Sequence, residues 1–317
     1  MAQGKDIKII CGNSNTPFAE DVCRNIGLRL GSADVTTFSD GEIAVSLNET
    51  VRGSDVFIIQ STCTPINDHL MEMLIMVDAS KRASASRVTC VMPYFGYARQ
   101  DRKAKSRDPI SAKLVANLIV SAGTDRVLTM DLHAAQIQGF FDIPVDNLLG
   151  APLFVDYYSK KFKGATDTVI VSPDIGSVAR ARAFALKMGL GLAIVDKRRE
   201  KANQAEVMNI IGSVEGKRVI LFDDMVDTAG SLCGAAHALV ENGGAKEIYA
   251  CASHGVLSGQ SIDLIEKSVI KEVIFTDTVP FCRERPCEKI KYLTAAPLFA
   301  EAINRIFEEV SISTLFR

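Results

Sequence analysis

Residues 219–232 read VILFDDMVDTAGSL, and this stretch decides the fold of the region around it. Its first four residues are β-branched, aliphatic or aromatic, as in a buried β-strand, and two aspartates follow directly. A helical pattern then begins at Leu232 and continues to Glu241. A strand that passes through a polar turn into a helix is the repeating unit of parallel α/β sheets, so we expect that unit here.

The turn between this strand and this helix favours a phosphate ligand. Backbone N–H groups and hydroxyls at a helix N-terminus form a cradle for phosphate. Four residues offer such groups here: Thr228, Ala229, Gly230 and Ser231. The carboxylates of Asp223 and Asp224 instead suit sugar hydroxyls, which donate hydrogen bonds to them. Together the two features suggest a ribose phosphate; the alternative is an ordinary turn in which Asp and Thr only cap the helix.

The same alternation recurs along the whole chain. Nine short apolar runs rich in β-branched residues are expected to be strands, at 7–11, 56–60, 88–92, 127–130, 168–171, 192–195, 219–222, 248–251 and 272–276. Amphipathic helices are expected between them, for example at 68–85 and at 110–122. This pattern predicts an α/β protein whose sheets are mainly parallel and flanked by helices.

The length of 317 residues predicts two domains. A run rich in Gly and Pro at 139–152 places their boundary near residue 147. We therefore expect an N-terminal domain at 1–147, a C-terminal domain at 148–305 and a tail at 306–317 that packs on the first domain. A strand followed by a polar loop occurs in each half, at 130–133 and at 222–225, which hints at duplication of one α/β fold.

Composition excludes several classes of protein. Lys and Arg total 36 against 38 Asp and Glu, giving a net charge of −2, so the overall charge favours neither nucleic acid nor an anionic membrane as a partner. No apolar stretch approaches the about 20 residues that span a bilayer, and the N-terminus lacks a signal-peptide pattern. The eight cysteines lie mostly in apolar runs, as buried thiols do in a reducing compartment. We expect a cytoplasmic protein.

Six segments together resemble the ribose-phosphate diphosphokinases, also called phosphoribosyl pyrophosphate synthetases, of the phosphate-activated class I. In chain order they are FSDGE at 38–42, PYFGYARQDR at 93–102, DLH at 131–133, SPD at 172–174, KRR at 197–199 and the stretch at 219–232. The resemblance runs from about residue 8 to 316 and implies two phosphoribosyltransferase-like domains. The chain has no Gly-x-x-x-x-Gly-Lys-Ser/Thr motif, so any ATP is held without a Walker loop.

The resemblance implies a reaction. Such enzymes transfer the β,γ-diphosphoryl group of ATP to the C1 hydroxyl of ribose 5-phosphate, with Mg²⁺ as cofactor, and release AMP; the product serves nucleotide biosynthesis. Lys197 and Arg199 then belong to a catalytic loop after the strand at 192–195, although such a basic run taken alone is more typical of a solvated loop. The residues implied for ribose 5-phosphate are Arg199, Asp223, Asp224, Asp227, Thr228, Ala229, Gly230 and Ser231.

The resemblance also implies an ATP site and two metal ligands. Arg99, Gln100 and His133 contact ATP, and a neighbouring subunit contributes Phe38, Asp40 and Glu42 to the adenine pocket. The metal ligands are His133, shared with the ATP site, and Asp174. Mg²⁺ normally prefers oxygen ligands, so an imidazole ligand is unusual.

Regulation and assembly follow only from the resemblance. Inorganic phosphate activates this class and ADP inhibits it at a site between subunits. The matching residues are Thr50, Arg52, Lys103, Ser106, Arg107, Ser311, Ser313 and Phe316. A homo-oligomer is implied, with a hexamer as the expected form.

Two other functions are open from the residues alone. A phosphoribosyltransferase shares the loop around Asp223 but does not need two α/β domains or the segment at 99–100. A non-catalytic relative, either a regulatory subunit or a DNA-binding repressor, is expected to lack the basic loop at 197–199 or to carry a DNA-reading module with a basic surface. The loop is present and such a module is not visible, so an active synthetase is the expected function.

Overall fold

The computed structural model describes residues 6–198, 207–281 and 285–316, and the chain divides into two compact units. Unit 1 holds Met1–Leu149, Thr278–Pro280 and Thr294–Arg317, and unit 2 holds Gly150–Asp277 and Phe281–Leu293. The chain first passes from unit 1 to unit 2 after Leu149, close to the domain boundary expected near residue 147.

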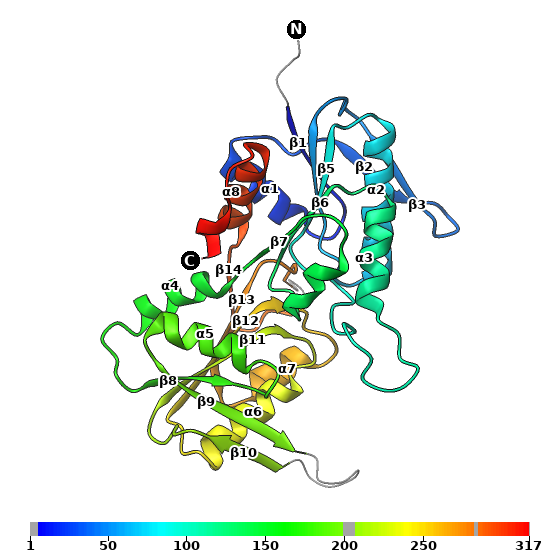
Figure 1. Cartoon of the computed structure of the whole chain (residues 1–317). Helices are drawn as coiled ribbons and strands as arrows, with labels where there is room; N and C mark the ends of the chain where they lie inside the picture. Colours follow the sequence, from blue (N-terminus) through cyan, green and yellow to red (C-terminus); the bar gives the residue numbers. More distant parts are fainter. Residues whose placement is uncertain (1–5, 199–206, 282–284, 317) are drawn as a thin grey trace. The chain divides into compact units, whose positions relative to one another are not determined.

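Unit 1 is built on a five-stranded parallel sheet with the order β1-β4-β5-β6-β7. The strands are β1 (Ile7–Cys11), β4 (Asp55–Ile59), β5 (Arg87–Met92), β6 (Arg126–Met130) and β7 (Val145–Leu148). One face carries α1 (Thr16–Ile26) and α8 (Ala296–Phe307), and the other carries α2 (Ile66–Arg82) and α3 (Ser111–Ser121) (Figure 1). Because helices cover both faces, every residue of β4 is buried.

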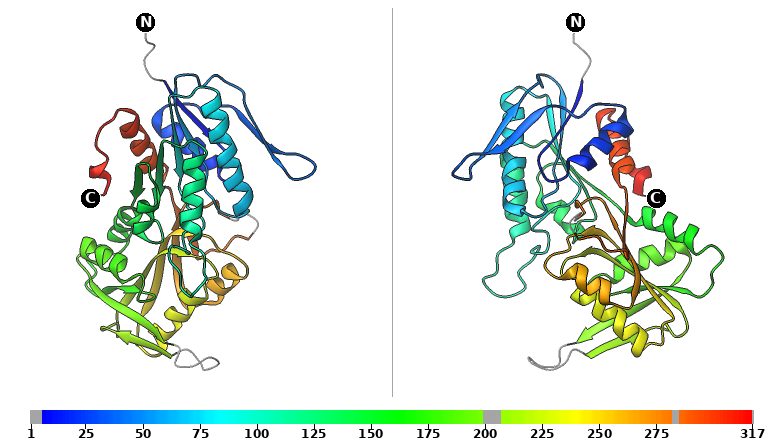
Figure 2. Two further views of the ribbon diagram at one scale, coloured as in Figure 1. Left: turned by 45° about the vertical axis from the view of Figure 1, so that its right-hand side comes forward. Right: turned by 180° about the vertical axis from the view of Figure 1, so that it is seen from behind.

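Unit 1 also contains a two-stranded hairpin and two short 3₁₀ helices. An antiparallel hairpin joins β2 (Ala33–Thr37) to β3 (Ile43–Leu47), and Figure 2 shows it extending away from the sheet. Short 3₁₀ helices follow β6 and end the chain, as η1 (Ala135–Phe140) and η2 (Ser313–Phe316).

Unit 2 has a seven-stranded sheet with the order β10-β9-β8-β11-β12-β13-β14, in which only β10 is antiparallel to its neighbour. The strands are β8 (Thr168–Ser172), β9 (Gly191–Arg198), β10 (Val207–Ile211), β11 (Arg218–Val226), β12 (Glu247–Gly255), β13 (Ile270–Thr276) and β14 (Ile290–Leu293). Helices α4 (Ala151–Lys161) and α5 (Val178–Met188) cover one face, and α6 (Gly230–Glu241) and α7 (Ser261–Lys267) cover the other (Figure 1).

The central strand β11 shows why this unit has two cores. Side chains alternate across a strand, so Val219 and Leu221 pack on the side of α6 and α7, while Ile220 and Phe222 pack on the side of α4 and α5. On the second side Phe222 stacks on Phe184 of α5, with ring centroids 4.4 Å apart. The apolar run at 219–222 therefore holds both layers of helices on the sheet.

The end of the chain differs from the expected domain division. Residues 294–305, expected in the C-terminal domain, belong to unit 1 together with Thr278–Pro280. The reason is the apolar side of α8, where Phe299 is fully buried and meets Phe18 of α1 edge to face at 5.4 Å. Arg87 Nη2 also donates a 3.0 Å hydrogen bond to the carbonyl of Ile306. Helix α8 thus completes the unit that the N-terminus begins.

All nine strands expected from the sequence are present, and so are the helices expected at 68–85 and 110–122. The sequence pattern missed β2, β3, β7, β10 and β14, which are partly exposed or lie at sheet edges, so that their apolar runs are short. No helix among the described residues is long and apolar enough to cross a bilayer. Among the described cysteines, Cys23, Cys63, Cys90 and Cys251 are buried free thiols, as expected, whereas Cys11, Cys233 and Cys287 are half-buried.

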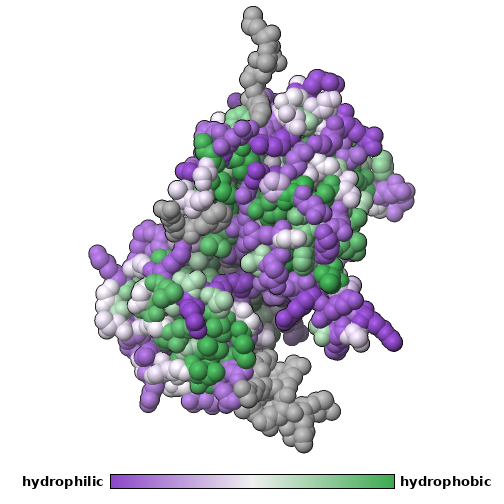
Figure 3. Space-filling model, in the orientation of Figure 1, coloured by the Kyte–Doolittle hydropathy of each residue, from purple (hydrophilic) through white to green (hydrophobic). Residues whose placement is uncertain are grey.

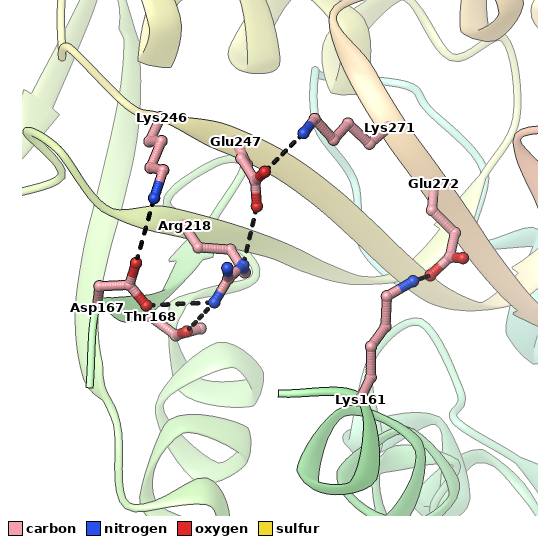
Figure 4. A network of polar contacts seen from close by, with 8 residues as sticks. All are labelled: Lys161, Asp167, Thr168, Arg218, Lys246, Glu247, Lys271 and Glu272. Carbon is pink, nitrogen blue, oxygen red and sulfur yellow. Dashed lines mark hydrogen bonds and ion pairs between the residues drawn. The ribbon is translucent and has the colours of Figure 1, made fainter. Parts of the chain in front are cut away.

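A network of ion pairs ties the amino ends of the strands in unit 2 together (Figure 4). The carboxylate of Glu272, on β13, is nearly buried and accepts from Lys161 Nζ at 2.5 Å and from Lys291 Nζ at 2.6 Å. Lys161 also lies over the ring of Tyr249, 4.9 Å from its centroid. Burial opposes ionisation of Glu272, but the hydrogen bonds from the two lysines outweigh it and hold its pKa below the usual value.

We expect Glu272→Gln to lower the free energy of unfolding by about 2 kcal/mol at pH 7, because it leaves two lysines without their shared carboxylate. A lowered pKa in the folded state adds stability that is present at neutral pH and is lost as pH falls through that pKa. The deficit of the variant should therefore stay constant from pH 7 to about pH 5 and narrow as the pH falls below about 4.5 in urea titrations. Glu266→Gln, at an exposed position of α7, is the control. A deficit that stays constant with pH would contradict this account.

Candidate functional site

The acidic pair predicted from the sequence lies at the point where the sheet of unit 2 changes direction. From β8 the chain passes through α5 to β9 on one side, whereas from β11 it passes through α6 to β12 on the other. The loops after β8 and β11 therefore diverge. In open α/β sheets, ligands bind outside the carboxyl ends of the strands at such a point.

Strand β11 extends further than its neighbour on one side. It pairs with β8 only as far as Leu221, opposite Val171, but with β12 as far as Val226, opposite Gly255. Asp223 and Asp224 are therefore part of β11, although the sequence pattern predicts that the strand ends at residue 222. Beyond Leu221, β11 pairs with β12 on one side only, and the polar groups on its other side can face a ligand. We call this side of β11 the candidate ligand edge.

Residues from the start of α5 hold the two carboxylates. Ser177 Oγ donates a 2.6 Å hydrogen bond to Asp223 Oδ1. Arg180 Nη1 lies 2.6 Å from Asp224 Oδ1 and 3.3 Å from Asp223 Oδ1, so one guanidinium serves both. The Asp224 side chain is 3% exposed and that of Asp223 is 20% exposed, so Asp223 is the more accessible acid.

The environment changes the protonation of Asp223. Burial, followed by the charge of Asp224, raises the pKa of Asp223 to about 7, although Ser177 and Arg180 favour its ionised form. The pair therefore carries less negative charge near neutral pH than two exposed aspartates would. This lowers the repulsion that an anionic ligand meets at the edge.

The turn after β11 has the form that an anion cradle requires. Helix α6 begins at Gly230, earlier than the Leu232 expected, and Ala229 precedes it in the left-handed conformation with φ 60°. An alanine rarely adopts this backbone, and such strain is concentrated at ligand sites. Thr228, Gly230 and Ser231 are exposed, so the positive end of α6 is open to an anion.

Asp174 lies in the loop between β8 and α5. Its carboxylate Oδ1 accepts a 2.8 Å hydrogen bond from the backbone N–H of Ser177, and Ser172 Oγ donates to its carbonyl at 2.7 Å. Asp174 itself is exposed. Ser177 thus joins Asp174 to Asp223. The sequence reasoning did not assign Ser177, although a hydroxyl residue directly before a helix is a signal for a cap.

The residues assigned to ATP by resemblance all lie in unit 1, in three segments. Phe38, Asp40 and Glu42 are exposed at the tip of the β2–β3 hairpin, where Phe38 N–H donates to the carbonyl of Glu42 at 2.8 Å. Phe38 is 60% exposed, an unusual position for a large apolar ring.

Arg99, Gln100 and His133 are exposed as well. Gln100 Oε1 accepts from Ser111 Oγ, and Asp101 next to it accepts a 2.8 Å hydrogen bond from Gln136 Nε2 in η1. Because Gln136 follows closely after His133, this bond joins the loop at 99–101 to the segment that carries His133. Asp131, at the start of that segment, has φ 40°, a second strained position.

The residues assigned to regulation by resemblance lie in three separate segments of unit 1, and those whose side chains are described are exposed. Thr50 and Arg52 follow β3, and Arg52 N–H donates to Thr50 Oγ1 at 3.4 Å. Lys103, Ser106 and Arg107 lie in the loop before α3. Near the C-terminus, Ser311 Oγ donates to Ser313 Oγ at 3.0 Å.

Three predicted residues fall partly or wholly outside the described part of the structure. Lys197 lies in strand β9, opposite Met208. The sequence pattern instead predicts that Lys197 lies in a loop. Arg199 lies outside the described residues, and the side chain of Phe316 is not described.

Family models match both ends of the chain. Residues 7–123 match the N-terminal domain of ribose phosphate pyrophosphokinase, and residues 198–317 match the phosphoribosyl synthetase-associated domain. Two relatives named ribose-phosphate pyrophosphokinase are 60% identical, from Caldanaerobacter subterraneus, and 58% identical, from Clostridium tetani; each alignment covers 98% of both chains. The crystal structure of phosphoribosylpyrophosphate synthetase from Mycobacterium smegmatis superimposes with a TM-score of 0.91 at 40% identity, over 96% of this chain and 100% of that one.

We expect Asp223→Asn to stabilise the protein at pH 8 by about 1–2 kcal/mol, because it removes a carboxylate whose charged form is disfavoured in the fold. A pKa raised by folding adds stability only at low pH and loses it as pH rises through the folded value near 7. The gain should therefore shrink as pH falls from 8 to 4.5 in thermal unfolding. Asp156→Asn, an exposed position of α4, is the control. A variant less stable than the wild type at pH 8 would refute the raised pKa.

Proposed function

The chain belongs to the ribose-phosphate pyrophosphokinase family, and we propose that it transfers the β,γ-diphosphoryl group of ATP to the C1 hydroxyl of ribose 5-phosphate. The products are 5-phosphoribosyl 1-diphosphate, for nucleotide biosynthesis in the cytoplasm, and AMP. The observation that carries the proposal is the edge in unit 2 where Asp223 and Asp224 lie beside the exposed start of α6. Carboxylates for sugar hydroxyls and a helix start for a phosphate fit a ribose phosphate.

In this proposal Asp223 accepts hydrogen bonds from the ribose hydroxyls. Thr228, Gly230 and Ser231 hold the 5-phosphate against the positive end of α6. Arg180 keeps both acids in place by pairing with Asp224 and Asp223. The C1 hydroxyl is then free to act as the nucleophile.

The chemical step is an in-line displacement at the β-phosphorus of ATP. The C1 oxygen forms the new bond to phosphorus and the hydroxyl proton passes to solvent. The bond between the β-phosphorus and the oxygen of the α-phosphate breaks, and AMP leaves with that oxygen and its electron pair. Charge spreads over the phosphoryl oxygens in the transition state, so fixed cations supply much of the catalysis. We assign that role to Lys197 and Arg199, and contact with ATP to Arg99, Gln100, His133, Phe38, Asp40 and Glu42.

Mg²⁺ fits this proposal as a companion of the substrate phosphates. The described residues contain no cluster of three or more His, Cys, Asp or Glu side chains able to hold a metal ion. Mg²⁺ commonly binds one or two protein ligands plus phosphate oxygens, which suits single exposed side chains such as Asp174 and His133. When bound, the ion would neutralise phosphoryl charge.

We propose that phosphate activates and ADP inhibits a homo-oligomer, expected to be a hexamer, through the residues assigned at 50–52, 103–107 and 311–316. Exposed apolar side chains support association of copies. Leu114 and Leu118 on α3 are 60% and 41% exposed, and Figure 3 shows apolar patches among polar ones on unit 1. Patches of this kind commonly mark interfaces.

The proposed reaction is tested by measuring AMP release from ATP and Mg²⁺, with and without ribose 5-phosphate and inorganic phosphate. AMP should form only when the sugar is present, and phosphate should accelerate it. AMP formed equally without the sugar would indicate simple hydrolysis. A folded protein that binds the sugar but forms no AMP under any condition would instead be a regulatory subunit.

We expect Lys197→Ala to lower kcat by about 100-fold or more, because its charge acts on the transition state, while KM for both substrates changes less than about threefold. Arg198→Ala removes the same charge at the next position and is the control. Steady-state kinetics with each substrate varied in turn make the measurement. A variant with normal kcat and raised KM would assign Lys197 to ground-state binding instead.

A further inference from the structure

The first main strands and helices of unit 1 follow the same order as those of unit 2. The order β1, α1, β4, α2, β5 matches β8, α5, β11, α6, β12, and a two-stranded segment precedes the second main strand in each case. The first and second main strands are parallel neighbours in both sheets. The counterpart of the ligand edge in unit 2 is therefore the edge after β1 and β4, and not the segment at 130–133 that the sequence pattern had paired with 222–225.

At this edge of unit 1 lies a buried carboxylate. Glu72, on α2, is 4% exposed. Its Oε2 accepts from the backbone N–H of Asn13 at 3.0 Å, and its Oε1 accepts from Asn13 Nδ2 at 2.7 Å. Gln60, directly after β4, donates from Nε2 to Oε2 as well. None of the ion pairs among the described residues includes Glu72, so amide donors alone hold its carboxyl group.

The side chains around Glu72 are buried and hydrogen-bonded to one another. Gln60 is fully buried, and its Oε1 accepts from the backbone N–H of Ser14 at 3.1 Å. A Cβ at Gly12 would lie 2.6 Å from that same oxygen, so any larger residue there would have to displace the Gln60 side chain. Ser14 Oγ in turn accepts from the N–H of Ser61 at 2.9 Å. The loops after β1 and β4 are joined through the side chains that lie between them.

Unit 2 differs at the corresponding position. The buried residues of α6, which corresponds to α2, are all apolar: Leu232, Ala235, Ala236, Ala238 and Leu239. No carboxylate from this helix reaches the edge after β8 and β11. The turn at 228–231 is instead largely exposed. The same fold thus has one filled edge and one open edge.

We propose that Glu72 is a built-in anionic ligand that occupies, in unit 1, the edge that unit 2 offers to a sugar phosphate. It therefore limits the chain to one site for ribose 5-phosphate; only the identity of that ligand rests on the proposed function. The carboxylate also positions the hairpin, because Asn13 Nδ2 donates to the carbonyl of Val35 in β2 at 3.1 Å. The group that fills the edge is thus also an anchor for the strand that leads to Phe38.

The test replaces the internal anion with an external one. Glu72→Ala removes the acceptor of three amide hydrogen bonds and opens a space the size of a carboxylate, so its unfolding midpoint should fall by about 5–10 °C. Adding about 100 mM formate, which supplies a carboxylate that can bind only the folded state, should recover at least half of that loss. The midpoint of the wild type in formate gives the baseline.

Two variants separate this account from a general effect of salt or of lost packing. Glu72→Gln keeps the volume of the side chain but points an amide NH₂ group at the amide donors of Asn13 and Gln60. This variant should therefore be less stable than the wild type and should not respond to formate. Glu301→Ala removes an exposed glutamate of the same unit and should respond as the wild type does. An equal response to formate in Glu72→Ala and the wild type would overturn the proposal.

Calorimetric titration of the wild type with ribose 5-phosphate tests the same idea without any variant, in case Glu72→Ala does not fold. One molecule bound per chain is expected, and two per chain would overturn the proposal. If the wild type binds no ribose 5-phosphate, the proposed function fails. The formate experiment then still decides whether Glu72 acts as an internal ligand.

Discussion

The ion pair between Arg180 and the two aspartates of β11 is the contact on which the candidate ligand edge of unit 2 depends. Two adjacent carboxylates on one strand repel each other, and burial makes their ionised forms more costly. A single guanidinium from α5 offsets part of this cost and at the same time fixes the start of α5 against β11. Ser177 adds a hydrogen bond at the same place. The loop after β8, which carries Asp174, therefore has its position set by the acids.

The course of β11 gives this contact its place. Because β8 stops pairing at Val171 while β12 continues to Gly255, the acids are supported on one side and accessible on the other. The apolar half of the same strand holds both helical layers. One nine-residue strand thus lies at the centre of the core at its beginning and forms one side of the candidate ligand edge at its end.

The strands with strong apolar runs, and the acids and small residues at 223–231, could be predicted from the sequence because burial and ligand chemistry each demand particular residue types. Other features depend on contacts that no local pattern records. The position of α8 in unit 1 results from Phe299 meeting Phe18, far away in the chain. The extension of β11 through Asp224 is fixed by its partner β12, and the pairing of Arg180 with both acids by the fold of α5 on the sheet. The weakly apolar strand β7 and the hairpin strands lack the long runs that predict a buried strand.

The two ends of the chain meet in one unit, where α1 and α8 share an interface. During synthesis the N-terminal sheet therefore leaves the ribosome long before α8, the helix that covers one of its faces. Phe18, Val22 and their neighbours become fully buried only when the last part of the polypeptide has been made. Unit 2 has all of its residues by Leu293 and can mature first. A premature stop near residue 294 would thus leave unit 1, which is translated first, without α8 and with an exposed apolar face. A chaperone that shields apolar surface would bind mainly at this face.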